Sequence, residues 1–394
     1  MSWQEVLSNE VLDIRDGTHD SPKYLDEGYP LITSKNLKQG IIDFSDVSLI
    51  SEEDYNNINK RSRVNKGDIL YSMIGSIGNY ALVNKEPHYA IKNVALFKFI
   101  DKRLYNKYFL HLINSFVIER QIKKAMKGGT QKFVSLKILR NLKIPLPPLD
   151  QQKKIAAILD AADAYRQKTK ALLKKYDELT QSLFLEMFGD PVTNPKGWEI
   201  KTIGDCFNVK GGKRLPKGSE YETTVTKHAY IRVKDFMANG LDTSDIKYIS
   251  EEIHDKISRY IISSNDVYIS IAGTIGLSGY VPESLSGANL TENAAKLIPK
   301  EAIEFRKEYL SFYLNSDYAQ QNIKSKTMAV GVPKLALFRI QELPYINAPI
   351  NVQDIFVRRV QAIESQKAQA QASLVQAEDL FNSLLQRAFK GELT

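Results

Sequence analysis

Two pairs of lysine-bearing segments have the residue types best suited to chemistry in this sequence. The first pair is ITSKN and IRVKD, and the second pair is KGGTQKF and VGVPKL. Each segment combines a lysine with small or polar side chains. Lysine and arginine bond phosphate oxygens and guanine edges, and asparagine and glutamine can pair with adenine. The predicted DNA contacts are Lys35, Asn36, Gln131, Lys132, Arg232, Lys234 and Lys334. We expect Lys35 to match Lys234, and Lys132 to match Lys334, in the two halves of the chain.

Two glycine loops offer a second kind of site, IGSIG at Ile74 to Gly78 and AGTIG at Ala272 to Gly276. A loop of this kind after a strand can bind phosphate through its backbone N–H groups. The alternative is a tight hairpin turn in which glycine supplies the positive φ. Neither loop is a Walker A motif, because no Gly-Lys-Ser or Gly-Lys-Thr ends it.

The sequence contains none of four common motifs for catalysis, cofactor binding or metal binding. An NPPY-type adenine-methyltransferase motif, a GxSxG elbow, an HExxH pair and a GxGxxG loop are all absent. The five histidines have no metal-ligand spacing with each other or with the single cysteine, Cys206. We therefore expect no catalytic centre, no cofactor and no metal site.

Composition favours a basic globular protein. The net charge is +8, the sequence pI is about 9.1, and 43% of the residues are hydrophobic. A basic balance makes nucleic acid the first partner to consider. The sequence has no apolar run of about 20 residues and no signal peptide at its start. Together with the single cysteine, this predicts a cytoplasmic location.

The chain is an internal duplication. Shifting the sequence by 199 residues pairs Ile32, Lys35, Asp43, Ser45, Asp46, Ile50, Ser51, Glu52 and Glu53 with Ile231, Lys234, Asp242, Ser244, Asp245, Ile249, Ser250, Glu251 and Glu252. Shifts of 198 and 201 continue the match as far as Phe188 and Phe389. This period is far longer than that of a solenoid repeat, so we expect two copies of a whole domain.

Each copy combines a strand-rich part, called a head here, with a long helix. In the first head we expect strands of one twisted sheet at Tyr29 to Thr33, Gly67 to Ile74, Tyr80 to Val83 and Ala95 to Ile100. In the second we expect them at Tyr230 to Val233, Asp266 to Ile271 and Gly279 to Val281. One further helix is predicted in each head, over Asn106 to Lys124 and over Phe305 to Ser325.

The two long helices carry heptad stripes. The first begins after the proline cluster IPLPPLDQQ, and the second begins after Pro349. The predicted seam of the first is Ile155, Ile158, Ala162, Tyr165, Thr169, Leu172, Tyr176, Leu179 and Leu183. That of the second is Phe356, Val360, Ile363, Ala370, Leu374, Ala377, Phe381, Leu384 and Ala388, interrupted by Lys367. Each helix could instead pack on its own head, but helices of roughly 55 Å favour pairing with each other.

A duplicated chain with two such helices predicts an α+β fold with two similar heads joined by a long antiparallel coiled coil. A two-fold axis perpendicular to a helix pair makes the helices antiparallel, which would place the heads at opposite ends of a rod. Half-sites on one side of DNA lie about 34 to 36 Å apart, a distance that this rod can span. The predicted boundaries are 1–149 and 191–348 for the heads, and 150–190 and 349–394 for the helices.

Several motifs make the chain resemble the specificity subunit of type I restriction-modification systems. They are PLPPLDQQKKIAAIL, LFLEMFGDPVTNPKGW, the GSIG and GTIG loops and the closing LLQRAFKGEL. The second helix start departs from the pattern, with one proline before Gln353, and the glycine loops lack a preceding arginine that is often present.

The resemblance implies that each head is a target recognition domain for one half of a bipartite, asymmetric DNA site. It also implies that the helices are conserved spacers beside which two adenine-methyltransferase subunits dock. An ATP-dependent restriction subunit would complete the complex, and this chain would be its non-catalytic specificity subunit.

Two alternatives from other classes remain at this stage. The first is a self-contained DNA methyltransferase or nuclease, against which the missing cofactor motif argues. The second is a coiled-coil adaptor that binds only protein. Binding of S-adenosylmethionine by the isolated chain would favour the enzyme over a DNA-recognition subunit. Salt-dependent affinity for duplex DNA would favour the DNA-recognition subunit over the protein-only adaptor.

Overall fold

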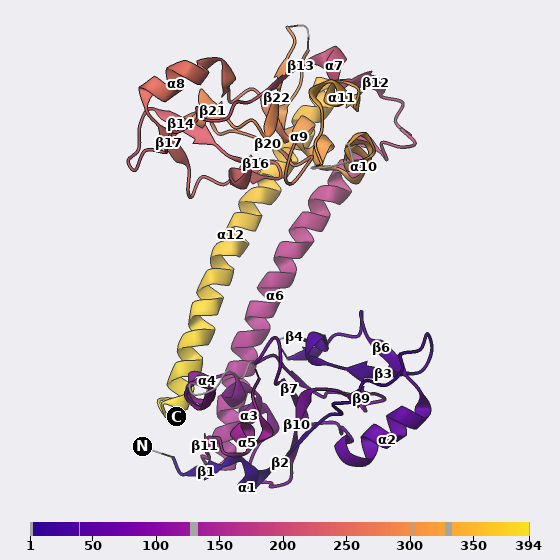
Figure 1. Ribbon diagram of the computed structural model, residues 1–394, viewed down its shortest axis with the longest axis vertical. Helices are drawn as coiled ribbons and strands as arrows, with labels where there is room; N and C mark the ends of the chain where they lie inside the picture. The colour runs from indigo at the N-terminus through magenta and orange to yellow at the C-terminus, as the bar shows by residue number, and fades with distance from the viewer. Residues whose placement is uncertain (1–2, 39, 127–132, 302, 328–332, 394) are drawn as a thin grey trace. The chain divides into compact units, whose positions relative to one another are not determined.

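The computed structural model describes residues 3–38, 40–126, 133–301, 303–327 and 333–393, and Figure 1 shows its elements. The chain divides into two units, 1–172 with 370–394 and 173–369. Each unit contains one head and a segment of both long helices, α6 (Leu149–Phe188) and α12 (Ile350–Phe389). The duplicated sequence is therefore also a duplicated fold.

Two sheets form the first head, where the sequence predicted one. The larger is antiparallel and has the order β2 (Leu12–Asp16), β10 (Val94–Phe99), β7 (Ile69–Ser72), β8 (Tyr80–Leu82). The smaller has the order β6 (Ser48–Ile50), β3 (Tyr29–Ile32), β9 (Ala90–Ile91), with β3 parallel to β9. Two short pairs complete the head, β1 (Glu5–Leu7) with β11 (Lys143–Pro145) and β4 (Leu37–Lys38) with β5 (Ile41–Ile42).

The second head repeats this plan and adds one strand. Its larger sheet has the order β13 (Phe207–Gly211), β22 (Ala294–Pro299), β19 (Val267–Ser270), β20 (Ser278–Tyr280). Its smaller sheet has the order β17 (Lys247–Ile249), β14 (His228–Ile231), β21 (Ala288–Leu290), β18 (Ile261–Ile262). The short pairs are β12 (Glu199–Thr202) with β23 (Pro344–Asn347) and β15 (Phe236–Met237) with β16 (Gly240–Leu241). β14 is parallel to β21, as β3 is to β9.

The helix predicted in each head is two helices. The first head has α3 (Asn106–Ile113) and α4 (Phe116–Met126), and the second has α9 (Lys307–Asn315) and α10 (Asp317–Lys326). Ser316 caps α10 by accepting a hydrogen bond of 3.4 Å from the Ala319 backbone N–H. The hydroxyl of Ser115, its equivalent, donates to the Leu112 carbonyl at 2.6 Å. Ser115 thus bonds the end of α3, and Ser316 caps the start of α10.

Shorter helices complete both heads. The first head also contains α1 (Ser8–Val11), α2 (Glu52–Ser62) and α5 (Leu136–Arg140). Their counterparts in the second head are α7 (Ile203–Cys206), α8 (Glu251–Ile257) and α11 (Leu337–Gln341). The α2 and α8 helices begin at the equivalent N-caps Ser51 and Ser250, so local signals are duplicated along with the strands.

Within each unit the segments of α6 and α12 are antiparallel. In the first unit, the Arg166 guanidinium lies 4.3 Å from the centroid of the Phe381 ring, and Lys170 pairs with Glu378 at 2.9 Å. In the second unit, Lys367 donates to Asp177 at 2.6 Å. The residue numbers of the partners on α12 decrease as the residue numbers on α6 increase. This confirms the predicted antiparallel direction.

The seam predicted for α12 is correct, but four of the nine residues predicted for the α6 seam are wrong. Ile158, Tyr165, Leu172 and Leu179 are 42%, 53%, 42% and 50% exposed. The row that is buried or half-buried instead is Ile155, Leu159, Ala162, Arg166, Thr169, Leu173, Tyr176, Thr180 and Leu183. Both rows have heptad spacing and lie side by side on the helix. Because arginine and threonine occupy part of the buried row, the exposed row is the more apolar in sequence.

A buried glutamine attaches the start of each long helix to its own head. The Oε1 of Gln152 accepts from the Tyr105 backbone N–H at 2.8 Å, and its Nε2 donates to the carbonyls of Pro147 at 2.8 Å and Arg103 at 2.7 Å. Gln353 accepts from Arg306 N–H at 2.8 Å and donates to Ala348 at 2.7 Å. Both side chains are fully buried.

Replacing Gln152 by leucine is expected to lower the free energy of unfolding by about 3 kcal/mol or more. The substitution keeps the volume but leaves a buried N–H and two carbonyls without this partner, at about 1–3 kcal/mol for each unsatisfied group. Urea unfolding of the full chain measures the loss. Gln151→Leu is the matched control because Gln151 is only half-buried. Equal stability of the two variants would contradict the anchoring function.

Candidate nucleic-acid interface

The predicted lysines Lys35 and Lys234 lie on one-turn helices of the same design. These turns are η1 (Ser34–Asn36) and η2 (Val233–Asp235). The last residue closes each turn: Asn36 Oδ1 accepts from the Thr33 N–H at 2.9 Å, and Asp235 Oδ2 accepts from the Arg232 N–H at 2.7 Å. Both lysines are exposed. The duplication thus presents one ammonium group on the same turn of each head.

The structure gives Asn36 a structural function in place of the predicted base contact. The residue is 4% exposed. Its Nδ2 donates to the carbonyls of Asp43 at 3.1 Å and Asp46 at 2.9 Å, and its Oδ1 accepts from the Thr33 hydroxyl at 3.0 Å as well as from the Thr33 N–H. An amide used in this way has no free edge for adenine.

Arg232 is likewise engaged within the fold. Its side chain is 14% exposed. Its Nε donates to Asp235 Oδ2 at 2.9 Å and its Nη2 to Asp235 Oδ1 at 2.5 Å. Nη2 also donates to the Asp245 carbonyl oxygen. The predicted base contact would require this network to open, so we assign Arg232 to positioning the turn that carries Lys234.

Neighbouring acids moderate the charge of these turns. Lys234 pairs with Asp245 at 2.7 Å, and Lys247 pairs with the same carboxylate at 2.6 Å. Their hydrogen bonds hold the pKa of Asp245 well below its usual range. In the first head, Lys38 bonds Asp43 and lowers the pKa of that carboxyl in the same way. Lys35 forms no ion pair with any residue that the structure describes.

The glycine loops are tight turns. Gly75 and Gly78 have φ of 72° and 99°, and Gly273 and Gly276 have φ of 78° and 91°. The Gly78 N–H donates to the Ser72 carbonyl at 3.2 Å, and the Gly276 N–H to that of Ser270 at 2.9 Å. These N–H groups close the hairpins, which favours the turn over a phosphate site.

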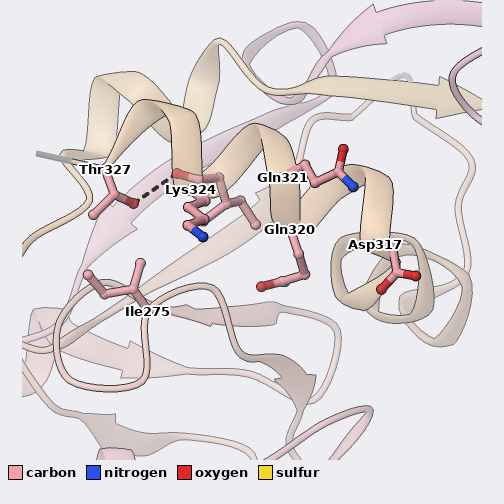
Figure 2. Close-up of a pocket in the computed structure, with 7 residues that line it drawn as sticks. Ile275, Asp317, Gln320, Gln321, Lys324 and Thr327 are labelled. Atoms are coloured by element: carbon pink, nitrogen blue, oxygen red, sulfur yellow. Dashed lines mark hydrogen bonds between the residues drawn. The ribbon is translucent and has the colours of Figure 1, made fainter. Parts of the chain in front are cut away.

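One cation beside the second glycine turn was not predicted from the sequence. Lys324, exposed on α10, borders a hollow of about 390 Å³ next to this turn. Figure 2 shows the side chains of Lys324 and Gln320 on the side of α10 that faces Ile275. Gln320 Nε2 donates to the Gly276 carbonyl at 3.0 Å and so fixes the turn against the helix. Lys324 joins the candidate contacts of the second head.

The last predicted segments require one correction. Gln131 and Lys132 lie outside the described residues, while Lys334 is exposed. The Val134 N–H donates to the Met73 carbonyl at 2.9 Å, as the Leu335 N–H does to that of Ile271 at 2.9 Å. Val134 and Leu335 are therefore equivalent, and Lys334 matches Phe133. The predicted match of Lys132 with Lys334 is wrong by one residue.

His19 and Arg214, in the loops after β2 and β13, were missed. His19 Nδ1 lies 2.8 Å from Asn93 Oδ1, and its Nε2 lies 2.9 Å from Asp16 Oδ2. Arg214 Nε donates to Glu292 Oε1 at 2.6 Å. The hydrogen bonds to Asn93 and Asp16 raise the pKa of His19. A glycine two residues before each of them, Gly17 or Gly212, was the available signal. These glycines match at a shift of 195 residues, whereas the recognised repeat begins at Ile32 with a shift of 199.

Metal and membrane sites are not found within the described part of the chain. Its His, Cys, Asp and Glu side chains form no group of three or more that could hold a metal ion. Cys206 is buried. None of the described helices combines the length and apolar character needed to cross a membrane.

Comparison with known proteins gives one consistent family. The type I restriction modification DNA specificity domain matches residues 2–180 and again 195–373. The EcoBI specificity subunit of a type I restriction enzyme from Escherichia coli is 23% identical, over 100% of this chain and 86% of the relative.

Two solved structures share the fold. A chain from a study of complex assembly and conformational transition of the type I R-M system is 20% identical, with a TM-score of 0.60, and the match covers 100% of this chain and 98% of that one. The S subunit of a type I restriction-modification system from M. genitalium is 18% identical, with a TM-score of 0.57, and the match covers 98% and 96%.

Proposed function

The chain belongs to the family of type I restriction modification DNA specificity domains, and from this premise we propose that it is the DNA-recognition subunit of a type I restriction-modification complex. The observation that carries this proposal is that the specificity domain occurs twice in one chain. In both copies, an exposed lysine stands on an equivalent turn, Lys35 and Lys234. A repeated domain with a repeated cation suits two contacts to one duplex.

Each head recognises one half of a bipartite, asymmetric DNA site in this proposal. The residues that shape the heads are duplicated, such as the caps Ser51 and Ser250. Exposed residues at equivalent positions differ, as Phe133 and Lys334 do. Similar scaffolds with different exposed side chains are expected where two heads recognise different bases. We retain 1–149 and 191–348 as the proposed recognition domains, and 150–190 and 349–394 as the spacer helices.

The chain works with partners that supply the chemistry. We propose two adenine-methyltransferase subunits that dock on the spacer helices, and an ATP-dependent restriction subunit. The exposed row Ile158, Tyr165 and Leu172 on α6 in the first unit supports docking. Its seven-residue spacing is the one with which a further helix packs. In this arrangement the chain itself is non-catalytic, and a methyltransferase subunit binds S-adenosylmethionine.

A protein-only adaptor is the second candidate, favoured by the same exposed row. Salt dependence separates it from DNA recognition. For the chain with its methyltransferase partner, we expect affinity for duplex DNA to fall by about 10³-fold or more between 50 and 200 mM salt, as for about six or more neutralised phosphates. Fluorescence anisotropy measures this change.

Substitution of the predicted lysines tests how much of this salt dependence comes from them. Lys35→Gln combined with Lys234→Gln is expected to reduce the slope of log affinity against log salt by about 2, about 1 for each phosphate contact. Lys174→Gln, an exposed lysine on α6, is the matched control and should leave the slope unchanged. Affinity that does not respond to salt would contradict DNA recognition. S-adenosylmethionine binding by the isolated chain would contradict the non-catalytic assignment.

A further inference from the structure

The loops after β2 and β13 each begin with an equivalent glycine, Gly17 or Gly212. The Gly17 N–H donates to the Val94 carbonyl at 3.1 Å, and the Gly212 N–H donates to that of Ala294 at 3.0 Å. A Cβ atom at Gly17 would lie 2.2 Å from the Ile91 carbonyl oxygen, and one at Gly212 would lie 2.1 Å from that of Thr291. Only glycine fits so close to a neighbouring backbone. Two residues later, each loop presents its exposed side chain, His19 or Arg214.

Both side chains bond to the same position of a second loop. The Thr18 N–H donates to the Ile91 carbonyl at 3.0 Å, as the Lys213 N–H does to that of Leu290 at 2.8 Å. The residue two places after each acceptor is Asn93 in the first head and Glu292 in the second. These are the partners of His19 and Arg214. The two side chains thus occupy one position of the duplicated fold.

Arg214 is oriented but remains open to a ligand. Its side chain is 78% exposed, and its Nε donates to Glu292 Oε1 at 2.6 Å. Glu292 is itself held, because its Oε2 accepts from the Thr291 hydroxyl at 3.0 Å. Within the described part of the chain, no acceptor bonds either Nη group of Arg214. A guanidinium held at Nε with its other N–H groups free can bond O6 and N7 of guanine together.

His19, at the equivalent position, carries a positive charge only when its imidazole is protonated. Both ring nitrogens face acceptor oxygens, of Asn93 and Asp16, and only the imidazolium form donates from both. The Arg61 guanidinium bonds the other oxygen of Asp16 and opposes this charge. The side chain of His19 is 60% exposed. The first head therefore carries a titratable cation where the second carries a permanent one.

We propose that His19 and Arg214 share one DNA-contacting position, and that Arg214 recognises a guanine in the half-site of the second head. This inference rests on the proposed function and deepens it. An exposed guanidinium stabilises little of the fold, so the hydrogen-bonded support from Glu292 and Thr291 has its clearest use in fixing the direction of the free N–H groups. Lys213, whose Nζ lies 5.7 Å from the centroid of the Tyr260 ring, adds a further cation to the same loop.

Sequence mapping with Arg214 variants tests the proposal. The chain with its methyltransferase partner modifies a library of duplexes, and the modified sequences are read. With Arg214→Gln we expect one base pair of the second half-site to lose its guanine preference by about tenfold to a hundredfold, the range for one bidentate contact. With Arg214→Lys we expect the same loss but an unchanged salt slope, because the charge remains. The first half-site should stay the same.

Lys217→Gln is the matched control, since it removes an exposed charge three residues along the same loop. It should leave the recognised sequence unchanged. An unchanged sequence with both Arg214 variants, or an equal loss on every sequence, would overturn the guanine assignment. A wild-type complex without a bipartite site would instead contradict the proposed function itself.

The shared position has a second readout in the first head. Recognition of the first half-site by wild type should weaken as pH rises through the pKa of His19, because the charge that faces the DNA is lost. His19→Gln should show no such weakening, and the second half-site should not respond in either protein. Equal pH profiles for wild type and His19→Gln would overturn the shared position.

Discussion

Seven residues inserted into α6 between Lys168 and Lys175, with seven more at the equivalent place in α12, are expected to move recognition to a site with a longer gap. Seven helical residues add roughly 10 Å of helix. This corresponds to about three base pairs of DNA at about 3.4 Å each. A whole heptad keeps the buried rows of both helices in register, so the pair can still form.

The expected effect on the original site is large. If the helices fix the separation of the contacts, only one head can bind that site correctly, and affinity falls toward the non-specific level. Specific binding typically exceeds non-specific binding by about 10³-fold to 10⁷-fold. Methylation of synthetic duplexes whose gaps increase one base pair at a time measures both the loss and the new optimum.

The control is a single insertion in α6 alone, which leaves α12 without a matching segment. It should lower stability and give no new gap preference. If the double insertion left the gap unchanged, the helices would not set the spacing.

Replacing Phe356 by alanine is expected to cost about 3–5 kcal/mol of unfolding free energy, the range for a buried phenylalanine. Phe356 on α12 is fully buried. Its ring centroid lies 5.2 Å from that of Phe188, 5.4 Å from that of Phe312 and 5.8 Å from that of Phe184. The substitution removes the centre of an aromatic cluster that joins α6, α12 and the second head within one unit.

Urea unfolding monitored by hydrogen exchange measures where this loss falls. The second unit should open more readily, while amides in the core of the first unit should keep their protection. Ile355→Ala is the matched control, because Ile355 is the neighbouring residue and is partly exposed; it should cost about 1 kcal/mol or less. Equal losses in both units, or equal effects of both variants, would contradict this account of the cluster.

Local features of the fold were predictable from the sequence because they depend on neighbours. Strand patterns and proline-bounded helix starts occur in both copies and were recognised there. Which strands pair with each other, and in which sheet, was not predictable from local sequence. β3 pairs with β9, about 60 residues along the chain, and no local pattern specifies that partner. The seam of α6 was misplaced because two heptad rows lie side by side, and the buried one contains Arg166 and Thr180.

Candidate contact residues were predictable where their position in a turn makes the side chain exposed. Lys35 and Lys234 are exposed on equivalent turns, as the duplication suggested. Asn36 could not be judged from residue type, because its amide is bonded by carbonyls seven and ten residues away. His19 and Arg214 were missed because the spacing between copies changes to 195 residues in that region. Their significance comes from the partners Asn93 and Glu292, which only the folded loops bring near.

Mapping of methylated adenines on DNA modified by this chain and its methyltransferase partner tests the central claim most directly. Two domains with similar scaffolds and different exposed residues predict two short, unlike sequence blocks separated by an unspecified gap of fixed length. One continuous block, two blocks related by a two-fold axis, or methylation without sequence preference would contradict that claim.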